Sequence, residues 1–405
     1  MTQSSVRDCG HAKEARLPRR DWFLLPMISL LTMALLAGST ELIARGMFTY
    51  TKTEAEDCMV LNDPSTGTRG IPGCEVWEKK GENQPVEYRF NRSGYRAEEN
   101  FGPKSPGTYR IVMVGSSYAF GMRVQMREAL ATLLPAELSQ VTGRRVELFD
   151  EAMAGMGGGP HSVALRFDDA LTVEPDMILW MLTPWDIQQG AAMLPTGDQI
   201  PVKGGSTISR AWRRIKAAFT ARSSTSAIDE IFSLTRTATL LRHFLYQSQS
   251  QYVKSFLIGP AGGPQFLSTK PSAEYENQLR ECEFYASQIE ARAAAAGVPL
   301  VAVLVPDRAQ AAMISMGEWQ ENYDPYKLDH ELRAIVLKHG GIYIDILPDF
   351  RTVPNPEQYY FPVDGHLDAQ GNAIVSGMVA KALTSGAVPA LRVTPQPQAA
   401  IKPGR

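Results

Sequence analysis

From residue 109 to residue 383 the sequence alternates between short apolar runs and longer amphipathic segments, and this alternation restricts the fold more than any other feature. The apolar runs are 111–114, 146–149, 177–182, 299–305 and 342–346, and the amphipathic segments are 118 onward, 127–138, 161–171, 273–296, 326–338 and 369–383. Strands that alternate with helices form a parallel sheet with helices on both faces. We therefore expect an α/β domain over residues 108–384, built as a three-layer sandwich around a central parallel sheet.

Residues of about 188–272 interrupt this rhythm. Helical periodicity appears at 208–215, 228–234 and 240–246 between polar and Gly/Pro-rich pieces, and no convincing strand is present. We interpret the segment as a helical cap inserted into the α/β domain. Its basic faces are typical of solvated helix surfaces packed on the domain by their other side, and less typical of helices lying on anionic lipid.

Residues 22–40 carry no charge, and at about 1.5 Å per residue a helix of this length crosses a hydrocarbon core. Basic residues precede the run and an acidic residue follows it: Arg7, Lys13, Arg16, Arg19 and Arg20, then Glu41. This asymmetry predicts a single-pass signal anchor, with residues 1–21 in the cytoplasm and the remainder outside it, in the periplasm if the cell is Gram-negative. A cleaved signal peptide is the alternative, because small residues occupy 37–39.

Composition narrows the partners. The chain has 405 residues, 44% of them hydrophobic, so it can bury a sizeable core. Its 41 Lys and Arg balance 43 Asp and Glu, and no basic stripe with interleaved aromatic residues is visible, so we expect no nucleic-acid partner. No histidine lies near a cysteine at zinc-ligand spacing, and we predict neither a metal nor another cofactor.

Two further segments flank the predicted domain. Residues 41–107 are rich in turn residues and are interpreted as a stalk and lead-in, and residues 385–405 as a disordered Pro-rich tail. Within the lead-in, Cys58 and Cys74 flank a Pro/Gly-rich loop, and a disulfide closing it outside the cytoplasm would add about 3 kcal/mol. The alternative is that all four cysteines are isolated small hydrophobic residues; on either reading Cys282 has no partner.

The run at 111–114 leads into Gly115-Ser116-Ser117-Tyr-Ala-Phe-Gly121 and then a helix. A serine at this turn lies at the carboxyl end of a parallel strand and at a helix N-terminus. Open α/β sheets bind ligands there, and backbone N–H groups at such a turn can stabilise an anion. The alternative is that Ser116 or Ser117 only caps the helix.

A second polar segment, Asp364-Gly-His366, lies between the last predicted strand and the last predicted helix. Of the six histidines, only His366 lies in a loop with an acid at close spacing. An imidazole that takes a proton from serine must be held in one tautomer, and Asp364 could do this. A turn with an Asx cap is the alternative.

On these segments the chain resembles the SGNH/GDSL hydrolase family, over residues 86–383. The family's first block matches 115–121 with Ser117 as the nucleophile, and the second block aligns Gly155 as an oxyanion-hole donor beside the Ser117 N–H. The third block resembles 175–187, and Asp364-Gly-His366 resembles the last block of the alginate-acetylation branch. The resemblance implies a flavodoxin-like strand order. Residues 91–96 and 109–110 also resemble the lead-in of membrane-anchored members.

Two positions depart from the family pattern. Ser116 replaces the aspartate that precedes the nucleophile, and Trp185 replaces the third-block asparagine, beside Asp186. Loss of an oxyanion donor costs on the order of 3–4 kcal/mol in the transition state. Slow catalysis, a substitute donor from elsewhere and no catalysis are all compatible with this loss. A bulky ring at the carboxyl end of a strand packs well against a sugar face, whereas its single N–H is poorly placed for a tetrahedral oxygen, so we interpret Trp185 and Asp186 as pocket residues, with Trp185 lining an acyl or sugar pocket.

The function expected from this resemblance is a membrane-anchored serine esterase acting on an ester, with an acylated envelope polysaccharide as substrate. An O-acyltransferase with the same Ser117, His366 and Asp364 is equally compatible, since only the acceptor differs. The alternative class is a non-catalytic carbohydrate-binding or envelope-assembly protein, which the changes at Ser116 and Trp185 would favour.

Overall fold

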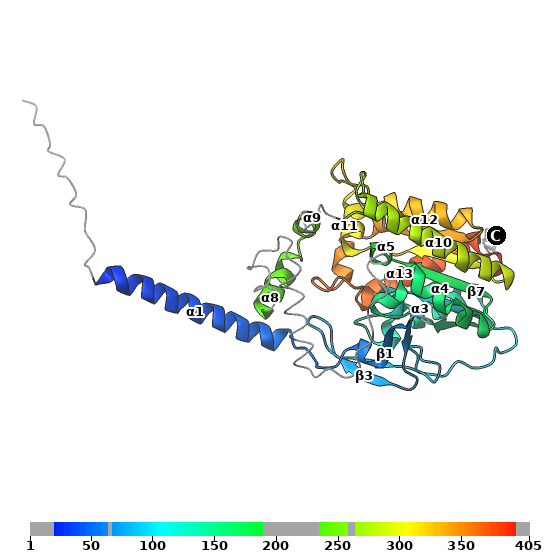
Figure 1. Ribbon diagram of the computed structural model, residues 1–405, viewed down its shortest axis with the longest axis horizontal. Coiled ribbons are helices and arrows are strands. Elements are labelled where there is room, and N and C mark those ends of the chain that lie inside the picture. Colours follow the sequence, from blue (N-terminus) through cyan, green and yellow to red (C-terminus); the bar gives the residue numbers. More distant parts are fainter. Residues whose placement is uncertain (1–19, 64–66, 189–234, 258–263, 394–405) are drawn as a thin grey trace, which may run out of the picture.

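The computed structural model describes residues 20–63, 67–188, 235–257 and 264–393 (Figure 1). At its centre lies a five-stranded sheet in which every pairing is parallel. Its strands are β5 (Tyr109–Gly115), β6 (Val146–Asp150), β7 (Met177–Leu182), β8 (Leu300–Leu304) and β9 (Ile342–Ile344). They are ordered β6-β5-β7-β8-β9, the flavodoxin-like order that was predicted.

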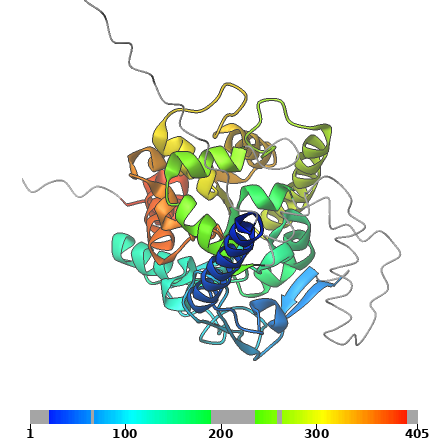
Figure 2. The ribbon, with the colours of Figure 1, turned by 90° about the vertical axis from the view of Figure 1, so that its left-hand side faces the viewer.

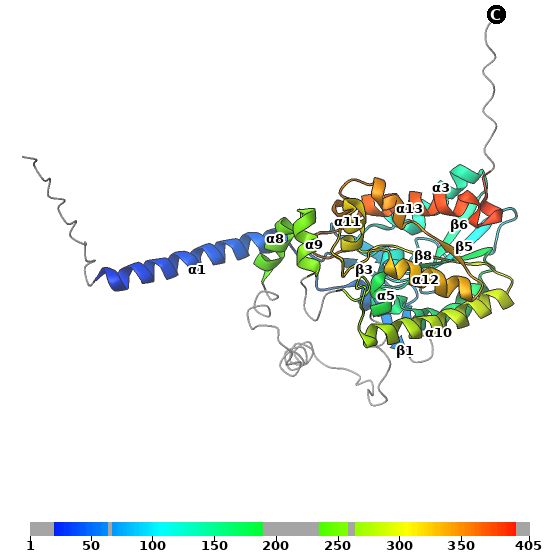
Figure 3. The same ribbon diagram turned by 90° about the horizontal axis from the view of Figure 1, so that it is seen from above.

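Helices cover both faces of the sheet, as the alternating sequence requires. One layer holds α3 (Leu130–Thr142) and α13 (Ala369–Ala382), which pack on each other. The other holds α4 (Pro160–Thr172), α10 (Ala273–Ala295) and α12 (Lys327–Lys338), and Figure 3 shows the sheet between the two layers. Every residue of β5, β7 and β8 is buried, which is why these strands are continuous apolar runs without alternation.

The segment interpreted as a stalk and lead-in is not a free stalk, because much of it packs on the domain. It forms two hairpins, β1 (Met59–Asp63) with β2 (Gly67–Gly70) and β3 (Glu75–Glu78) with β4 (Val86–Arg89). Val86, Tyr88 and Phe90 are at most 1% exposed and belong to the main core. The turn residues therefore join short strands, and the alternate apolar positions bury one face of the second hairpin.

A disulfide joins Cys58 to Cys74, the pair expected from the sequence, and Cys282 is free and buried. Cys58 ends the short helix η1 (Ala55–Cys58), and Cys74 immediately precedes β3. The bridge therefore ties the two hairpins together at one edge of the domain.

Helix α1 (Asp21–Met47) extends away from the α/β domain in Figure 1, and in Figure 2 it points toward the viewer in front of the domain. Its most apolar window has a mean hydropathy of 1.8 and no buried residue, so among the described residues it is the helix long and apolar enough to cross a membrane. A signal sequence meets the same criterion. The helix extends beyond the predicted segment 22–40: it begins at Asp21 and continues through Glu41 to Met47.

Two helices of the predicted insertion are described, α8 (Arg236–Leu245) and α9 (Gln249–Leu257). Helix α8 packs against the domain end of α1. There the Glu41 carboxylate accepts hydrogen bonds from the Thr237 N–H at 2.9 Å and the Thr237 hydroxyl at 2.8 Å. The helices predicted at 208–215 and 228–234 lie outside the described residues.

Two differences from the sequence prediction concern the end of the chain and a helix near the sheet edge. The predicted disordered tail begins too early, because residues up to Val393 are described and Leu391 is 1% exposed; residues 394–405 lie outside the described part. Helix α11 (Arg308–Met316), which follows β8, was not predicted. Its alanine-rich sequence is buried almost throughout, so it lacks the polar face that marks an amphipathic helix.

Candidate active site

Ser117 stands where β5 ends and the short helix α2 (Ser117–Phe120) begins. The preceding Gly115 has φ of +155°, and a Cβ there would lie 2.4 Å from the Met181 carbonyl oxygen of the neighbouring strand. Only glycine fits so close an approach. The strand can therefore turn sharply and present the Ser117 hydroxyl at the carboxyl edge of the sheet.

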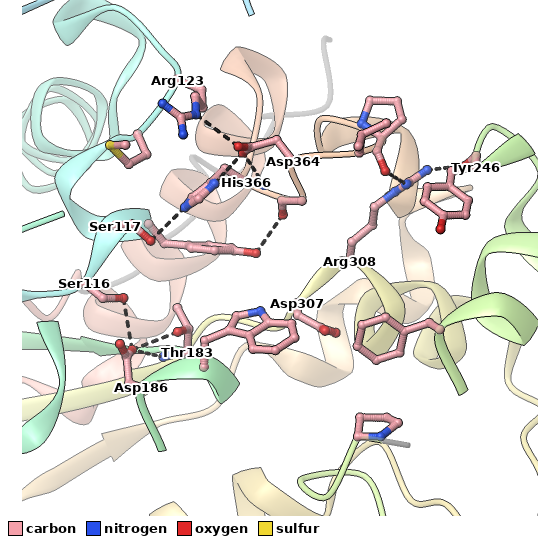
Figure 4. Close-up of a pocket in the computed structure, with 18 of the residues that line it drawn as sticks. Ser116, Ser117, Arg123, Thr183, Asp186, Tyr246, Asp307, Arg308, Asp364 and His366 are labelled. Carbon is pink, nitrogen blue, oxygen red and sulfur yellow. Dashed lines mark hydrogen bonds and ion pairs between the residues drawn. The ribbon is translucent and has the colours of Figure 1, made fainter. Parts of the chain in front are cut away.

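The Ser117 hydroxyl contacts His366 across 249 residues of sequence. His366 Nε2 lies 2.8 Å from Ser117 Oγ, and His366 Nδ1 lies 2.5 Å from Asp364 Oδ1 (Figure 4). The loop that carries both residues is closed by a hydrogen bond from the Phe361 N–H to the His366 carbonyl at 2.8 Å. The three side chains form a continuous Ser–His–Asp chain at hydrogen-bonding distances. The distance between Ser117 and His366 lies in the range expected for such a triad.

Arg123 supports the acid of this chain and was not identified from the sequence. Its Nε donates to Asp364 Oδ2 at 3.1 Å, and its guanidinium also pairs with Glu78 of β3. Burial alone would raise the pKa of Asp364, but the nearby charges of His366 and Arg123 hold it well below its usual range. Asp364 is therefore ionised, as a carboxylate that orients an imidazole must be.

Glu82, in the turn between β3 and β4, fixes the loop that carries Asp364. Its carboxylate accepts hydrogen bonds from the Val363 N–H at 2.8 Å and the Asp364 N–H at 3.2 Å. Its other oxygen lies 2.6 Å from Nδ1 of His243 on α8. The lead-in segment therefore contributes to the site and is not a free stalk.

Gly155 opens the short helix η3 (Gly155–Gly158) after β6, with φ of +60°. It lines the same pocket as Ser117, and its role as an oxyanion-hole donor stays a prediction. Gly158, at the end of the same helix, lies against Ser116: a Cβ on it would come within 2.0 Å of the Ser116 Cα. The glycine-rich segment therefore lets one backbone approach another beside the nucleophile.

Ser116, one of the two departures from the family pattern, is hydrogen-bonded to Asp186 at the carboxyl edge of the sheet. The Ser116 hydroxyl donates to Asp186 Oδ2 at 3.1 Å, and the same oxygen accepts from the Thr183 N–H at 2.7 Å. Burial raises the pKa of Asp186 to about 7 despite these hydrogen bonds. Asp186 lines the pocket, but its carboxylate is engaged in joining the turn after β5 to the turn after β7.

Trp185 is 37% exposed and lies in the wall of the same pocket. Its ring meets Phe256 of α9 edge-on at 6.3 Å between centroids and Phe266 at 6.1 Å. The indole therefore stands in an aromatic wall, as expected for a pocket residue.

The pocket has a volume of about 770 Å³. Residues of the lead-in, the α/β domain and the helical insertion line it. Ser117, His366 and Asp364 lie on one side of Asp307 in Figure 4, and Tyr246 of the helical insertion lies on the other. Asp307 and Arg308, which follow β8, were not predicted as site residues. The available signal was their position, since polar side chains directly after a buried parallel strand reach the ligand-binding edge. Among the described residues, no group of three or more His, Cys, Asp or Glu side chains is arranged to hold a metal ion.

Comparison with known proteins gives one family match. Residues 266–404 match the family described as "SGNH hydrolase-like domain, acetyltransferase AlgX". The matched part contains Asp364 and His366 but not Ser117. No curated protein matches the chain.

Solved structures with a similar arrangement include TesA, with a TM-score of 0.37, 10% identity, and coverage of 68% of this chain and 97% of that one. A catalytic mutant of Axe2, an acetylxylan esterase from Geobacillus stearothermophilus, has a TM-score of 0.36 and 10% identity, covering 70% of this chain and 96% of that one. The lipase/acylhydrolase from Enterococcus faecalis has a TM-score of 0.32 and 12% identity, covering 68% and 95%.

The fold and the family match define the class: this is an α/β protein of the SGNH-hydrolase type, with a parallel sheet and a Ser–His–Asp chain at its carboxyl edge. Within that class, the matched segment relates it to the alginate O-acetylation proteins.

Proposed function

We propose that the protein is a serine esterase that removes an O-acyl group from a glycan of the cell envelope. The observation that carries the proposal is the Ser–His–Asp chain, in which His366 lies 2.8 Å from the Ser117 hydroxyl and 2.5 Å from the ionised Asp364. A serine that only capped helix α2 would need no imidazole at its hydroxyl.

In the first half-reaction the Ser117 oxygen attacks the acyl carbonyl carbon while His366 Nε2 takes the hydroxyl proton. Asp364 holds the imidazole by Nδ1 and stabilises its positive charge. The backbone N–H groups of Ser117 and Gly155 serve as donors to the oxyanion. His366 then returns the proton to the sugar oxygen as the C–O bond breaks, which leaves an acyl-Ser117 ester.

The second half-reaction decides between two activities. Water attacking the acyl-enzyme makes the protein an esterase, and a sugar hydroxyl makes it an O-acyltransferase. The family match favours keeping transfer as the second candidate, because the matched domain is described as that of an acetyltransferase.

The apolar helix α1 supports the proposal of an envelope substrate. Helix α1 has the length and composition of a membrane span, and we propose that it anchors the protein with the α/β domain outside the cytoplasm. A reporter fused after residue 405 tests this: activity outside the cytoplasm, with retention in the membrane during a high-salt wash, is expected. Reporter activity in the cytoplasm would contradict it.

The activity is tested with p-nitrophenyl acetate, which needs no glycan contacts. We expect the wild-type protein to release p-nitrophenol and the Ser117→Ala variant to lose at least a thousandfold in kcat. Adding methyl glucopyranoside as an acceptor then separates the two activities, because transfer yields an acetylated sugar and hydrolysis yields acetate. A wild-type protein that is folded but inactive, with no more turnover than Ser117→Ala, would contradict both and favour the non-catalytic carbohydrate-binding alternative.

A further inference from the structure

Asp307 is a buried pocket carboxylate that the proposed chemistry does not use. It stands just after β8, and its Oδ1 caps helix α11 by accepting a hydrogen bond from the Gln310 N–H at 2.7 Å. The residue is 2% exposed and lines the pocket that contains Ser117. Its second oxygen, Oδ2, has no hydrogen-bond partner.

The guanidinium of the adjacent Arg308 does not donate a hydrogen bond to Asp307 Oδ2. Arg308 Nε donates to the Glu357 carbonyl at 2.9 Å, its Nη1 to the Pro362 carbonyl at 2.5 Å and its Nη2 to the Tyr246 carbonyl. Arg308 therefore holds three backbone segments together around the pocket. Burial raises the pKa of Asp307 to about 7, although the backbone N–H groups of Gln310 and Ala309 and the charge of Arg308 act to lower it.

The rest of the lining indicates what would satisfy this oxygen. Glu56 lines the same pocket and also has a buried oxygen without a partner, Oε2. Trp185, Tyr252 and Phe256 supply aromatic surface. A ligand that fits both features brings several hydrogen-bond donors and an apolar face, as a sugar ring does. A long acyl chain would leave Asp307 Oδ2 and Glu56 Oε2 buried without hydrogen bonds, which costs free energy.

We propose that Asp307 Oδ2 accepts a hydrogen bond from a hydroxyl group of the sugar that carries the acyl group, while the Trp185 ring packs against the sugar. This inference rests on the proposed function and deepens it, since it assigns the glycan side of the pocket. Asp307 is then a specificity residue: it binds the sugar and takes no part in acyl transfer to Ser117.

The experiment compares two substrates, p-nitrophenyl acetate and mono-O-acetylated methyl glucopyranosides, with Asp307→Asn. Asparagine keeps an oxygen for the α11 cap and places an amide where Oδ2 stood. We expect KM for the sugar acetates to rise about tenfold or more, with kcat and the rate on p-nitrophenyl acetate within twofold of wild type.

Asp150→Asn is the matched control. Asp150 is also buried at the end of a strand, with Oδ1 accepting a hydrogen bond from the Ala152 N–H and Oδ2 without a hydrogen-bond partner, but it does not line the pocket. We expect it to leave KM for the sugar acetates unchanged. An unchanged KM in Asp307→Asn, or an equal loss on both substrates, would overturn the assignment, because the second result is that of a purely structural residue.

Failure of the proposed function is distinguished by a binding measurement. If the wild type turns over neither ester, the Ser117→Ala variant is titrated with methyl glucopyranoside while tryptophan fluorescence is followed. Saturable quenching that disappears in Asp307→Asn and in Trp185→Phe supports the sugar subsite without any catalysis. Quenching that both variants retain, or no quenching, contradicts it.

Discussion

The Ser116 hydroxyl donates a 3.1 Å hydrogen bond to the Asp186 carboxylate, which joins the turn carrying the nucleophile to the turn that follows the neighbouring strand. Both residues are buried, at 4% and 6% exposed. The serine at this position therefore suits a site where a carboxylate already stands just after the adjacent strand.

Replacing Ser116 with the aspartate of the family pattern should therefore destabilise the protein. Ser116→Asp would place a second carboxylate against Asp186, whose pKa is already raised to about 7 by burial. Two close buried carboxylates cannot both ionise at low cost, so one must take up a proton. We expect a loss of about 2–4 kcal/mol in unfolding free energy at pH 8 and a smaller loss at pH 5, where protonation relieves the repulsion.

Chemical denaturation at the two pH values measures this difference, with Ser116→Asn as the uncharged control of similar size. An equal loss for Ser116→Asp at pH 5 and pH 8 would show that shape, and not charge, disfavours aspartate here.

Arg123 should matter for both stability and pH response. Arg123→Gln leaves the buried Glu78 and the partly buried Asp364 without this cation, and breaking the buried pair with Glu78 costs about 3–5 kcal/mol at pH 7. In the wild type the lowered pKa of Asp364 stabilises the fold above the carboxyl group's unfolded pKa, and that contribution is lost only as pH falls through the lowered value. The deficit of the variant should shrink toward pH 4, where its unpaired carboxylates protonate.

Urea unfolding from pH 4 to pH 8 follows this deficit. Arg89→Gln is the control, since Arg89 forms an exposed pair with Glu75 whose loss should cost no more than about 1 kcal/mol. A deficit for Arg123→Gln that does not vary with pH would be inconsistent with the role assigned to this arginine.

The close approach of Gly158 to Ser116 gives a third prediction. Gly158→Ala places a Cβ within 2.0 Å of the Ser116 Cα, so the backbone beside the nucleophile must shift. A displacement of about 1 Å at a catalytic group can cost a hundredfold in rate, and we expect kcat on p-nitrophenyl acetate to fall by about that factor.

Gly159→Ala is the neighbouring control, because a Cβ there meets nothing closer than the Asp186 carbonyl oxygen at 3.6 Å. Its kcat should stay within about twofold of wild type. Equal rates in the two variants would mean that the approach of η3 to Ser116 is unimportant for turnover.

The sequence predicted those site residues that lie in short recognisable patterns, and missed those whose role depends on contacts with residues far away in the sequence. The turn after β5 and the Asp364-Gly-His366 loop carry short patterns, and the strand alternation brings both to one edge, so Ser117, Asp364 and His366 were identifiable. Arg123 was not, because a single arginine after a helix has no pattern that points to an acid 241 residues away. The same applies to Glu82, whose carboxylate contacts the Asp364 loop only after the β3–β4 hairpin has folded onto the domain.

The fold shows the same division. Parallel strands buried on both faces are apolar throughout and were located within a few residues, whereas the hairpins of the lead-in are only half-buried and surrounded by turn residues. Their alternation at Val86, Tyr88 and Phe90 was visible, but nothing local shows which surface such a hairpin covers.

Trp185 supplies a fourth prediction. Trp185→Asn removes the exposed ring and restores the amide of the family pattern, so KM for sugar acetates should rise at least fivefold while kcat is retained. Activity on p-nitrophenyl acetate should stay the same or increase through the added donor. If kcat instead falls a hundredfold with KM unchanged, Trp185 belongs to the oxyanion hole.

The most direct test of the account is modification of Ser117 by a fluorophosphonate, which reacts with a serine only when a base activates it. Peptide mapping of the full-length protein by mass spectrometry should find the phosphonyl group on Ser117, with no labelling of Ser117→Ala and about a thousandfold slower labelling of His366→Ala. An unlabelled wild-type protein with an intact fold, or labelling at the same rate in His366→Ala, would contradict the claim that these residues form a working nucleophilic site.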